Sequence, residues 1–107
     1  MNKKTPKVIW ATEATVQLRE AAAYIRQYSP DKAKHIRQEI KDATKRLAEF
    51  PLLGRVVPEF PEGLHRELIV GNYRIIYGVA EAHVEIVQVI HGIRDLLAIP
   101  FFRRRSY

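Results

Sequence analysis

Residues 65–70 (HRELIV) and 73–79 (YRIIYGV) are typical of two strands, and they are separated only by Gly71 and Asn72. Glycine at the first central position of a two-residue connection is typical of a type II′ turn, which joins two antiparallel strands. A turn this short fixes the strand register, and the register determines which side chains share a face of the sheet. The sequence therefore predicts a β-hairpin, and it limits the fold to classes that contain an antiparallel sheet.

The predicted register divides the hairpin side chains between two faces. One face carries the pairs Val70–Tyr73, Leu68–Ile75 and Arg66–Tyr77, and the other carries Ile69–Arg74 and Glu67–Ile76. Because the first face is more apolar, we expect it to contact the helices, with Tyr73 and Tyr77 as core aromatics rather than base-stacking platforms. Glu67 and Arg74 are then diagonal neighbours on the opposite face, where we expect an ion pair.

Residues 83–90 predict a third strand, which ends at His91. We expect a two-residue turn before it, at Glu81 and Ala82. Regular alternation then places three apolar side chains on the helix face, those of Val84, Ile86 and Ile90. The same alternation places four side chains on the outer face with Glu67 and Arg74, namely Glu85, Val87, Val89 and His91.

Two amphipathic helices are predicted before the hairpin, after a short strand at residues 8–10. Thr12 followed by Glu13 is a helix start signal, and apolar residues then recur at spacings of four and three: Ala14, Leu18, Ala21, Ile25 and Tyr28. Ser29, Pro30 and Asp31 repeat the start signal. The second apolar stripe consists of Ala33, Ile36, Ile40, Ala43, Leu47 and Phe50. We expect the two helices to form an antiparallel hairpin on the sheet.

The predicted order of elements is strand, helix, helix, a loop at residues 52–64, and a three-stranded meander. This β-α-α-β-β-β order favours an α+β domain in which the helix hairpin packs on one face of a mostly antiparallel sheet. A chain of 107 residues is the usual size of one domain. We therefore expect a single domain over residues 1–107 with a basic C-terminal tail at 98–107.

The composition argues against metal chemistry and export. The chain has no cysteine, and its four histidines show no metal-ligand spacing, so we expect neither a metal nor another cofactor. No apolar run reaches the roughly 20 residues needed to span a bilayer, and residues 1–7 lack the apolar core of a signal peptide. We expect a cytoplasmic protein.

The formal net charge of +6 predicts an acidic partner. Residues 1–50 carry 11 Lys or Arg against 6 Asp or Glu, whereas residues 51–95 carry 4 against 6. Five basic residues lie opposite the apolar stripe of the second helix, namely Lys32, Lys34, Arg37, Lys41 and Lys45. We predict that four of them, Lys34, Arg37, Lys41 and Lys45, contact the acidic partner if this face binds one. This face is either solvated or a binding surface for an acidic segment.

Three stretches in sequence order, FPLLGR, RELIVGNYRIIYGV and VEIVQVIHGIRDL, resemble the RelE/ParE superfamily of bacterial toxins. The resemblance covers about residues 8–97. It implies the toxic half of a type II toxin-antitoxin module, silenced by a cognate antitoxin whose acidic, partly disordered segment wraps around it. In the RelE branch the toxin cleaves messenger RNA on the ribosome, and the ParE branch is associated with poisoning DNA gyrase.

RNA cleavage through a 2′-hydroxyl needs a proton acceptor, a proton donor and cations near the phosphorus oxygens. The stretch that carries several basic residues in the nuclease branch has only Arg66 here. The remaining nuclease candidates are Glu67, Arg74, His91 and Arg94. Because residues 51–95 are net acidic, they suit an RNA substrate poorly. We therefore expect a ParE-like gyrase inhibitor rather than an enzyme, with a ribosome-dependent endoribonuclease of RelE type as the alternative.

His91 and Arg94 lie at and beyond the end of the last strand. His91 is either a general base or a strand end bonded to local backbone. Arg94 either forms a surface ion pair with Asp95 or contacts an anionic partner. We predict that the target is bound by Arg94 and the aromatic-basic tail, which contains Phe101, Phe102, Arg103, Arg104 and Arg105.

Overall fold

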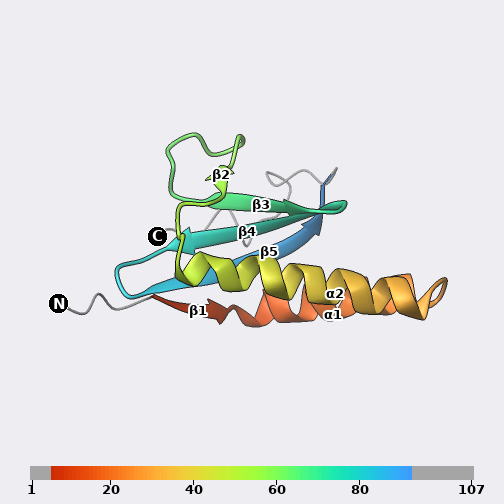
Figure 1. Cartoon of the computed structure of the whole chain (residues 1–107). Helices are drawn as coiled ribbons and strands as arrows, with labels where there is room; N and C mark the ends of the chain where they lie inside the picture. The colour runs from red at the N-terminus through yellow and green to blue at the C-terminus, as the bar shows by residue number, and fades with distance from the viewer. Residues whose placement is uncertain (1–5, 93–107) are drawn as a thin grey trace.

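The computed structural model describes residues 6–92 and shows two helices packed on one face of a five-stranded sheet (Figure 1). The strand order in the sheet is β1-β5-β4-β3-β2. The elements are β1 (Lys7–Trp10), α1 (Thr12–Arg26), α2 (Pro30–Lys45), the 3₁₀ turn η1 (Arg46–Ala48), β2 (Arg55–Val56), β3 (Arg66–Val70), β4 (Tyr73–Val79) and β5 (His83–His91). The expected α+β class and the helix hairpin are confirmed.

The first strand joins the last. β1 runs parallel to β5, whereas the other neighbouring pairs are antiparallel. Past the end of β1, the Ala11 N–H donates to the Ile86 carbonyl at 2.9 Å. The Gln17 side chain of α1 then accepts from the Val89 N–H at 2.6 Å and donates to the Gln88 side chain at 2.7 Å. Helix α1 therefore satisfies edge groups of β5 that β1 does not reach.

The hairpin register is confirmed, with Val70 opposite Tyr73 and Glu67 opposite Ile76. Gly71 adopts φ 58°, the left-handed conformation that glycine takes most readily. The Tyr77 ring is fully buried in the core between helices and sheet, and its hydroxyl accepts from the Gly54 N–H at 2.8 Å. The length and residue types of this turn were therefore sufficient to predict which side chains of β3 and β4 lie opposite one another.

The predicted faces of β5 are wrong for its second half. Tyr77 pairs with Ile86 but Ile76 pairs with Gln88, so Val87 is an extra residue in the strand. Such a β-bulge reverses the alternation beyond it. Val89 consequently lies in the helix-side core and His91 lies opposite Tyr73, whereas the side chain of Ile90 packs on the outer face.

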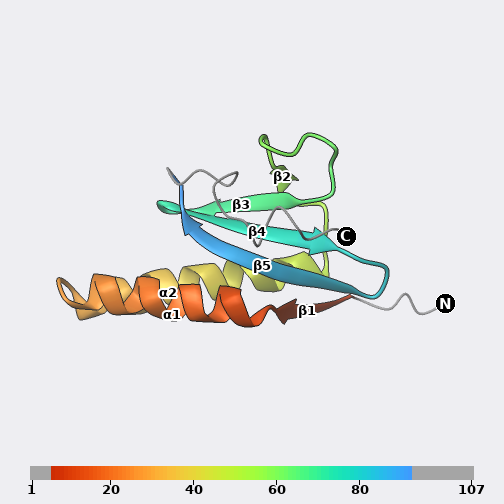
Figure 2. The ribbon, with the colours of Figure 1, turned by 180° about the vertical axis from the view of Figure 1, so that it is seen from behind.

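The helix ends differ in detail from the prediction. Ser29 caps α2 as expected, accepting from the Lys32 N–H at 3.2 Å, but Ala11 rather than Thr12 is the N-cap of α1. The tip of the hairpin projects beyond the sheet (Figures 1 and 2). Tyr28 and Phe50 lie past the helix ends and are 73% and 54% exposed, so assigning both to the buried stripes was wrong.

The outer face of the sheet is covered by residues 57–64, here named the covering loop. The Val57 N–H donates to the His65 carbonyl at 3.1 Å and closes the neck of this loop. Phe60 packs against a second apolar cluster on the outer face, which contains Val57, Ile76, Val87 and Ile90. The predicted plain loop at 52–64 thus contains the edge strand β2 and gives the sheet a second buried face.

Within residues 6–92, no helix is both long enough and apolar enough to cross a membrane.

Candidate functional site

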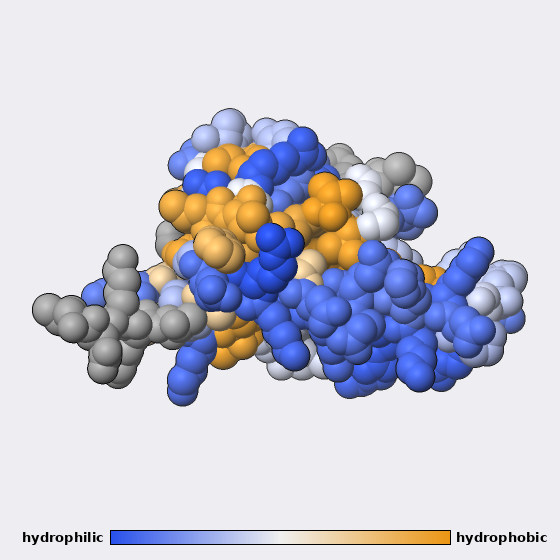
Figure 3. Space-filling model, in the orientation of Figure 1, coloured by the Kyte–Doolittle hydropathy of each residue, from blue (hydrophilic) through white to orange (hydrophobic). Residues whose placement is uncertain are grey.

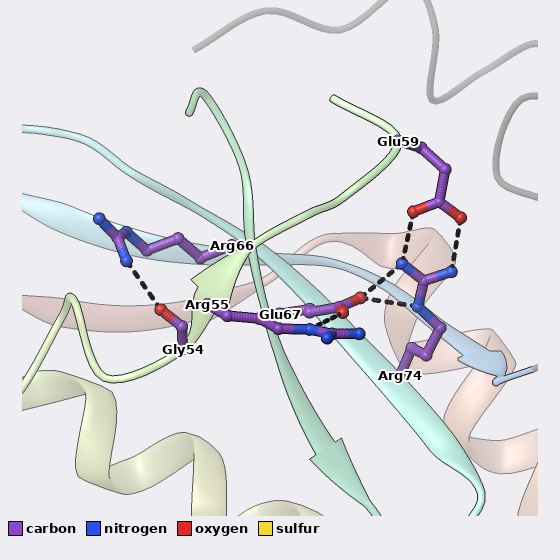
Figure 4. Close-up of polar contacts among 6 residues, drawn as sticks. All are labelled: Gly54, Arg55, Glu59, Arg66, Glu67 and Arg74. Carbon is purple, nitrogen blue, oxygen red and sulfur yellow. Dashed lines mark hydrogen bonds and ion pairs between the residues drawn. The ribbon is translucent and has the colours of Figure 1, made fainter. Parts of the chain in front are cut away.

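Four charged side chains form one ion-pair network on the outer face of the sheet (Figure 4). Arg74 of β4 donates from Nε to the Glu67 carboxylate of β3 at 2.6 Å. Both Nη atoms of Arg74 donate to the two oxygens of Glu59 in the covering loop, each at 2.8 Å. Arg55 of β2 donates from Nε to the second oxygen of Glu67 at 2.6 Å. The predicted Glu67–Arg74 pair is therefore confirmed and is part of a larger arrangement.

The network contains two arginines and two glutamates, and these side chains differ in their exposure to solvent. The side chain of Glu67 is 0% exposed and that of Glu59 is 25% exposed, whereas Arg55 is 63% exposed. Hydrogen bonding to Glu59 raises the pKa of Arg74 above its ordinary value, so the guanidinium stays charged. The hydrogen bond from Arg74 holds the pKa of Glu59 below its ordinary value. Arg74 and Glu59 are thus both ionised at neutral pH.

The lowered pKa of Glu59 predicts an acid-dependent stability difference. The folded-state pKa lies below the unfolded one, so this interaction is fully present above the unfolded pKa and is lost as pH falls through the folded value. We expect Glu59→Gln to be less stable than the parent at pH 7 and the difference to shrink steadily below about pH 4.5. Urea unfolding of both proteins from pH 7 to pH 3 measures this stability difference. A stability difference that does not change with pH would contradict the predicted role of the Glu59 carboxylate.

A cavity of about 410 Å³ lies beside the network, between the covering loop and the β3–β4 turn. Its lining includes Arg55, Glu59, Ile69, Tyr73, Arg74 and His91. The imidazole of His91 lies against the Tyr73 ring, with centroids 5.8 Å apart. The cavity therefore brings together the end of β5 and the charged pair of the hairpin.

The predicted nuclease residues are only partly brought together. Both oxygens of Glu67 and all three guanidinium nitrogens of Arg74 already have partners inside the protein. While these contacts hold, neither group is free to take a proton or to stabilise a phosphate. His91 is exposed at the cavity, and Arg94 lies outside the described residues.

A second candidate surface is the basic groove, defined by Arg26, Lys34, Arg37 and Lys41 between the two helices. Its volume is about 380 Å³, and a neighbouring cavity of about 220 Å³ shares Arg37 and Lys41 and adds Arg19. Among residues 6–92, none of these five cations forms an ion pair. Figure 3 shows hydrophilic residues over this part of the molecule. An acidic ligand would therefore meet uncompensated positive charge here.

Three of the four predicted antitoxin-binding residues line the groove, while Lys45 is exposed elsewhere on α2. Sequence reasoning missed Arg19 and Arg26 of α1. Their spacing of seven residues places both on one helix face, which was a usable signal. It also missed Glu59, because nothing local in a proline-punctuated loop indicates contact with β4. The predicted target-binding residues Arg94, Phe101, Phe102, Arg103, Arg104 and Arg105 lie outside the described part of the chain.

Comparison with known proteins agrees with this fold. Residues 8–96 match the family described as "ParE toxin of type II toxin-antitoxin system, parDE". "Toxin RelE2" of Caulobacter vibrioides is 34% identical over 88 residues, covering 82% of this chain and 97% of that protein. A chain of the "Chromosomal ParDE TA system from P. aeruginosa" superposes with a TM-score of 0.67 at 19% identity, covering 83% of this chain and 98% of that one. This structural likeness supports the fold.

A helix hairpin on a five-stranded sheet, together with these matches, defines a toxin of the RelE/ParE superfamily. Within that class, the chain belongs to the ParE toxin family of type II toxin-antitoxin systems. A toxin of such a system has a cognate antitoxin as its partner.

Proposed function

We propose that this toxin acts in the cytoplasm as a ParE-like inhibitor of DNA gyrase and does not cleave RNA. The observation that carries the proposal is the ion-pair network. Two of the four residues that a nuclease would need, Glu67 and Arg74, are bonded to each other and to internal partners. RNA cleavage would require the network to break, leaving the fully buried Glu67 carboxylate with fewer partners. Binding a protein target leaves the bond between Arg74 and Glu67 in place.

The first test compares two activities of the same protein, one with purified components and one in expressing cells. We expect inhibition of supercoiling by purified gyrase, and no new codon-linked ends in primer extension on messenger RNA from expressing cells. Clear cleavage ends without gyrase inhibition would instead support the RelE-type endoribonuclease, a possibility raised by the name of the Caulobacter relative. His91, exposed at the cavity, would then be the first residue to examine.

Target binding is proposed to involve Arg94 and the basic tail. We expect Arg94→Ala, and separately removal of residues 101–107, to weaken gyrase inhibition about tenfold or more, because each removes positive charge. His91→Gln is the matched control and should inhibit nearly as well as the parent. Supercoiling assays on variants with unchanged circular dichroism measure the effect. Loss of activity in His91→Gln alone would contradict the docking role.

The basic groove is proposed to bind an acidic segment of the cognate antitoxin. Its cations have no acidic partner within the described residues, and the groove runs along the exposed side of the helix hairpin. Lys34, Arg37 and Lys41, with Lys45 further along α2, would steer and orient the segment. Arg19 and Arg26 extend the same surface on α1.

Reversing one groove charge is expected to slow antitoxin association several-fold at low salt. Lys41→Glu changes a groove residue, whereas Lys32→Glu makes the same change on the same helix outside the groove lining. The difference between them should vanish near 1 M salt, where the Debye length is about 3 Å. Stopped-flow association rates provide the measurement. Equal slowing by both substitutions would argue for a general charge effect without a defined groove.

A further inference from the structure

Glu59 lies in a loop, whereas the other members of the ion-pair network lie on strands. Arg55, Glu67 and Arg74 lie on paired strands of the sheet. Glu59 lies in the covering loop and reaches Arg74 through its side chain alone (Figure 4). The hydrogen bond between Val57 and His65 fixes the neck of the loop, and Glu59 lies beyond that neck. The carboxylate can therefore leave Arg74 without breaking a strand pairing.

The cavity beside the network gives another group access to Arg74. Arg74 and Glu59 both line it, and Glu59 retains 25% exposure, so the contact between them faces an open volume of about 410 Å³. Two planar N–H groups of Arg74 point at the two Glu59 oxygens, the geometry with which arginine recognises a carboxylate. We infer that Glu59 is an internal occupant of a carboxylate-binding site, and that an acidic side chain of a partner protein displaces it and releases the covering loop.

Charge balance favours a carboxylate over a phosphate as the incoming group. The site has two arginines and two glutamates, and Glu67 stays buried at its floor. One carboxylate that replaces Glu59 conserves both the net charge and the paired hydrogen bonds. A phosphate monoester carries a charge of about −1.5 to −2 at pH 7, so it would add negative charge beside Glu67.

The surroundings also indicate what lies next to the incoming carboxylate. Ile69, on the outer face of β3, is 57% exposed and lines the same cavity, as does Tyr73. An apolar side chain near the acidic one would cover Ile69 and remove its surface from water. The partner is therefore an acidic protein segment that carries an apolar residue near its carboxylate.

Chemical rescue tests whether the site accepts an external carboxylate. Glu59→Ala removes the internal group and leaves Arg74 with Glu67 alone; propionate, which carries the same carboxylate end, is the probe. We expect 100 mM sodium propionate to raise the melting temperature of Glu59→Ala by about 4 °C relative to sodium chloride of equal ionic strength. The parent and Glu62→Ala, which alters another acidic residue of the same loop, should not respond. Adding Arg74→Gln to Glu59→Ala should abolish the rescue.

If propionate does not raise the melting temperature of Glu59→Ala, or raises that of the parent equally, the proposed carboxylate-binding site is wrong. Stronger rescue by inorganic phosphate than by propionate overturns the assignment to a carboxylate and favours a phosphate-bearing partner. A second measurement uses the unaltered protein with poly-L-glutamate, followed by amide hydrogen exchange. Faster exchange at residues 58–63 supports displacement of Glu59, and unchanged exchange there overturns it. Neither measurement involves gyrase or RNA, so both results can be interpreted even if the proposed inhibition of gyrase is wrong.

Discussion

Replacing Arg74 with methionine is expected to lower the free energy of unfolding by about 3–5 kcal/mol. Arg74 donates to both Glu67 and Glu59, and the Glu67 side chain has no exposure to water. Without the guanidinium, a buried carboxylate is left with only Arg55, and the desolvation of its charge is no longer offset. Urea unfolding at pH 7, monitored by circular dichroism, measures the loss.

Two further variants separate charge from packing at this position. Arg74→Lys keeps the positive charge but not the planar fork, so its loss should be smaller than that of Arg74→Met. Combining Arg74→Met with Glu67→Gln should recover part of the stability, because the buried charge is then absent. A loss below about 1 kcal/mol in Arg74→Met would show that the network contributes little, as exposed ion pairs do.

Replacing Gly54 with alanine is expected to cost about 3 kcal/mol. A Cβ at this position would lie 2.5 Å from the Glu67 carbonyl oxygen and 2.8 Å from the Tyr77 ring and hydroxyl. These atoms belong to the backbone of β3 and to a fully buried side chain, so they have little room to move. Overpacking costs about 1–3 kcal/mol. Displacement of Tyr77 also weakens its hydrogen bond to the Gly54 N–H. Thermal and urea unfolding provide the measurement.

Gly63→Ala is the matched control in the same segment of the chain. Gly63 has φ 84°, and no atom lies within 4 Å of the position a Cβ would take, so only backbone strain of about 1–2 kcal/mol is expected. Tyr77→Phe isolates the hydrogen bond and should cost about 1 kcal/mol. If Gly54→Ala were no more destabilising than Gly63→Ala, close contact at Gly54 would not be what requires a glycine there.

The accuracy of the sequence-based fold prediction followed the range of the interactions involved. The Gly71–Asn72 turn and the helix periodicity act over a few residues, and both located their elements correctly, although Tyr28 and Phe50 do not belong to the buried stripes. The bulge at Val87 was missed although the alternation breaks there, since Ile86 and Val87 are adjacent apolar residues between Glu85 and Gln88. Its surroundings include contacts with Gln17, more than 70 positions away in the chain. Local periodicity carries no information about such a partner.

In the candidate site, too, the locally determined contact was predicted and the long-range contact was missed. Glu67 and Arg74 were predicted as a diagonal pair because the hairpin register is set locally. The contribution of Glu59 depends on how the covering loop folds over the outer face, which its prolines and glycines do not specify. The apolar signal was nevertheless present, since Val57, Ile76, Val87 and Ile90 need a second buried face. An excess of apolar residues on a predicted outer face is therefore a sign that a loop covers it.

The parallel pairing of β1 with β5 has a consequence for how the toxin is made. Lys7 pairs with His83 and Trp10 with Ile86, so the first strand to leave the ribosome has no partner until the last strand is synthesised. Contacts between such distant segments slow folding, because the chain between them must be ordered before they form. Synthesis of the toxin therefore includes an interval in which the residues of both helices have been made and the sheet is incomplete. A partner that binds the helix hairpin can engage the nascent chain before the sheet closes.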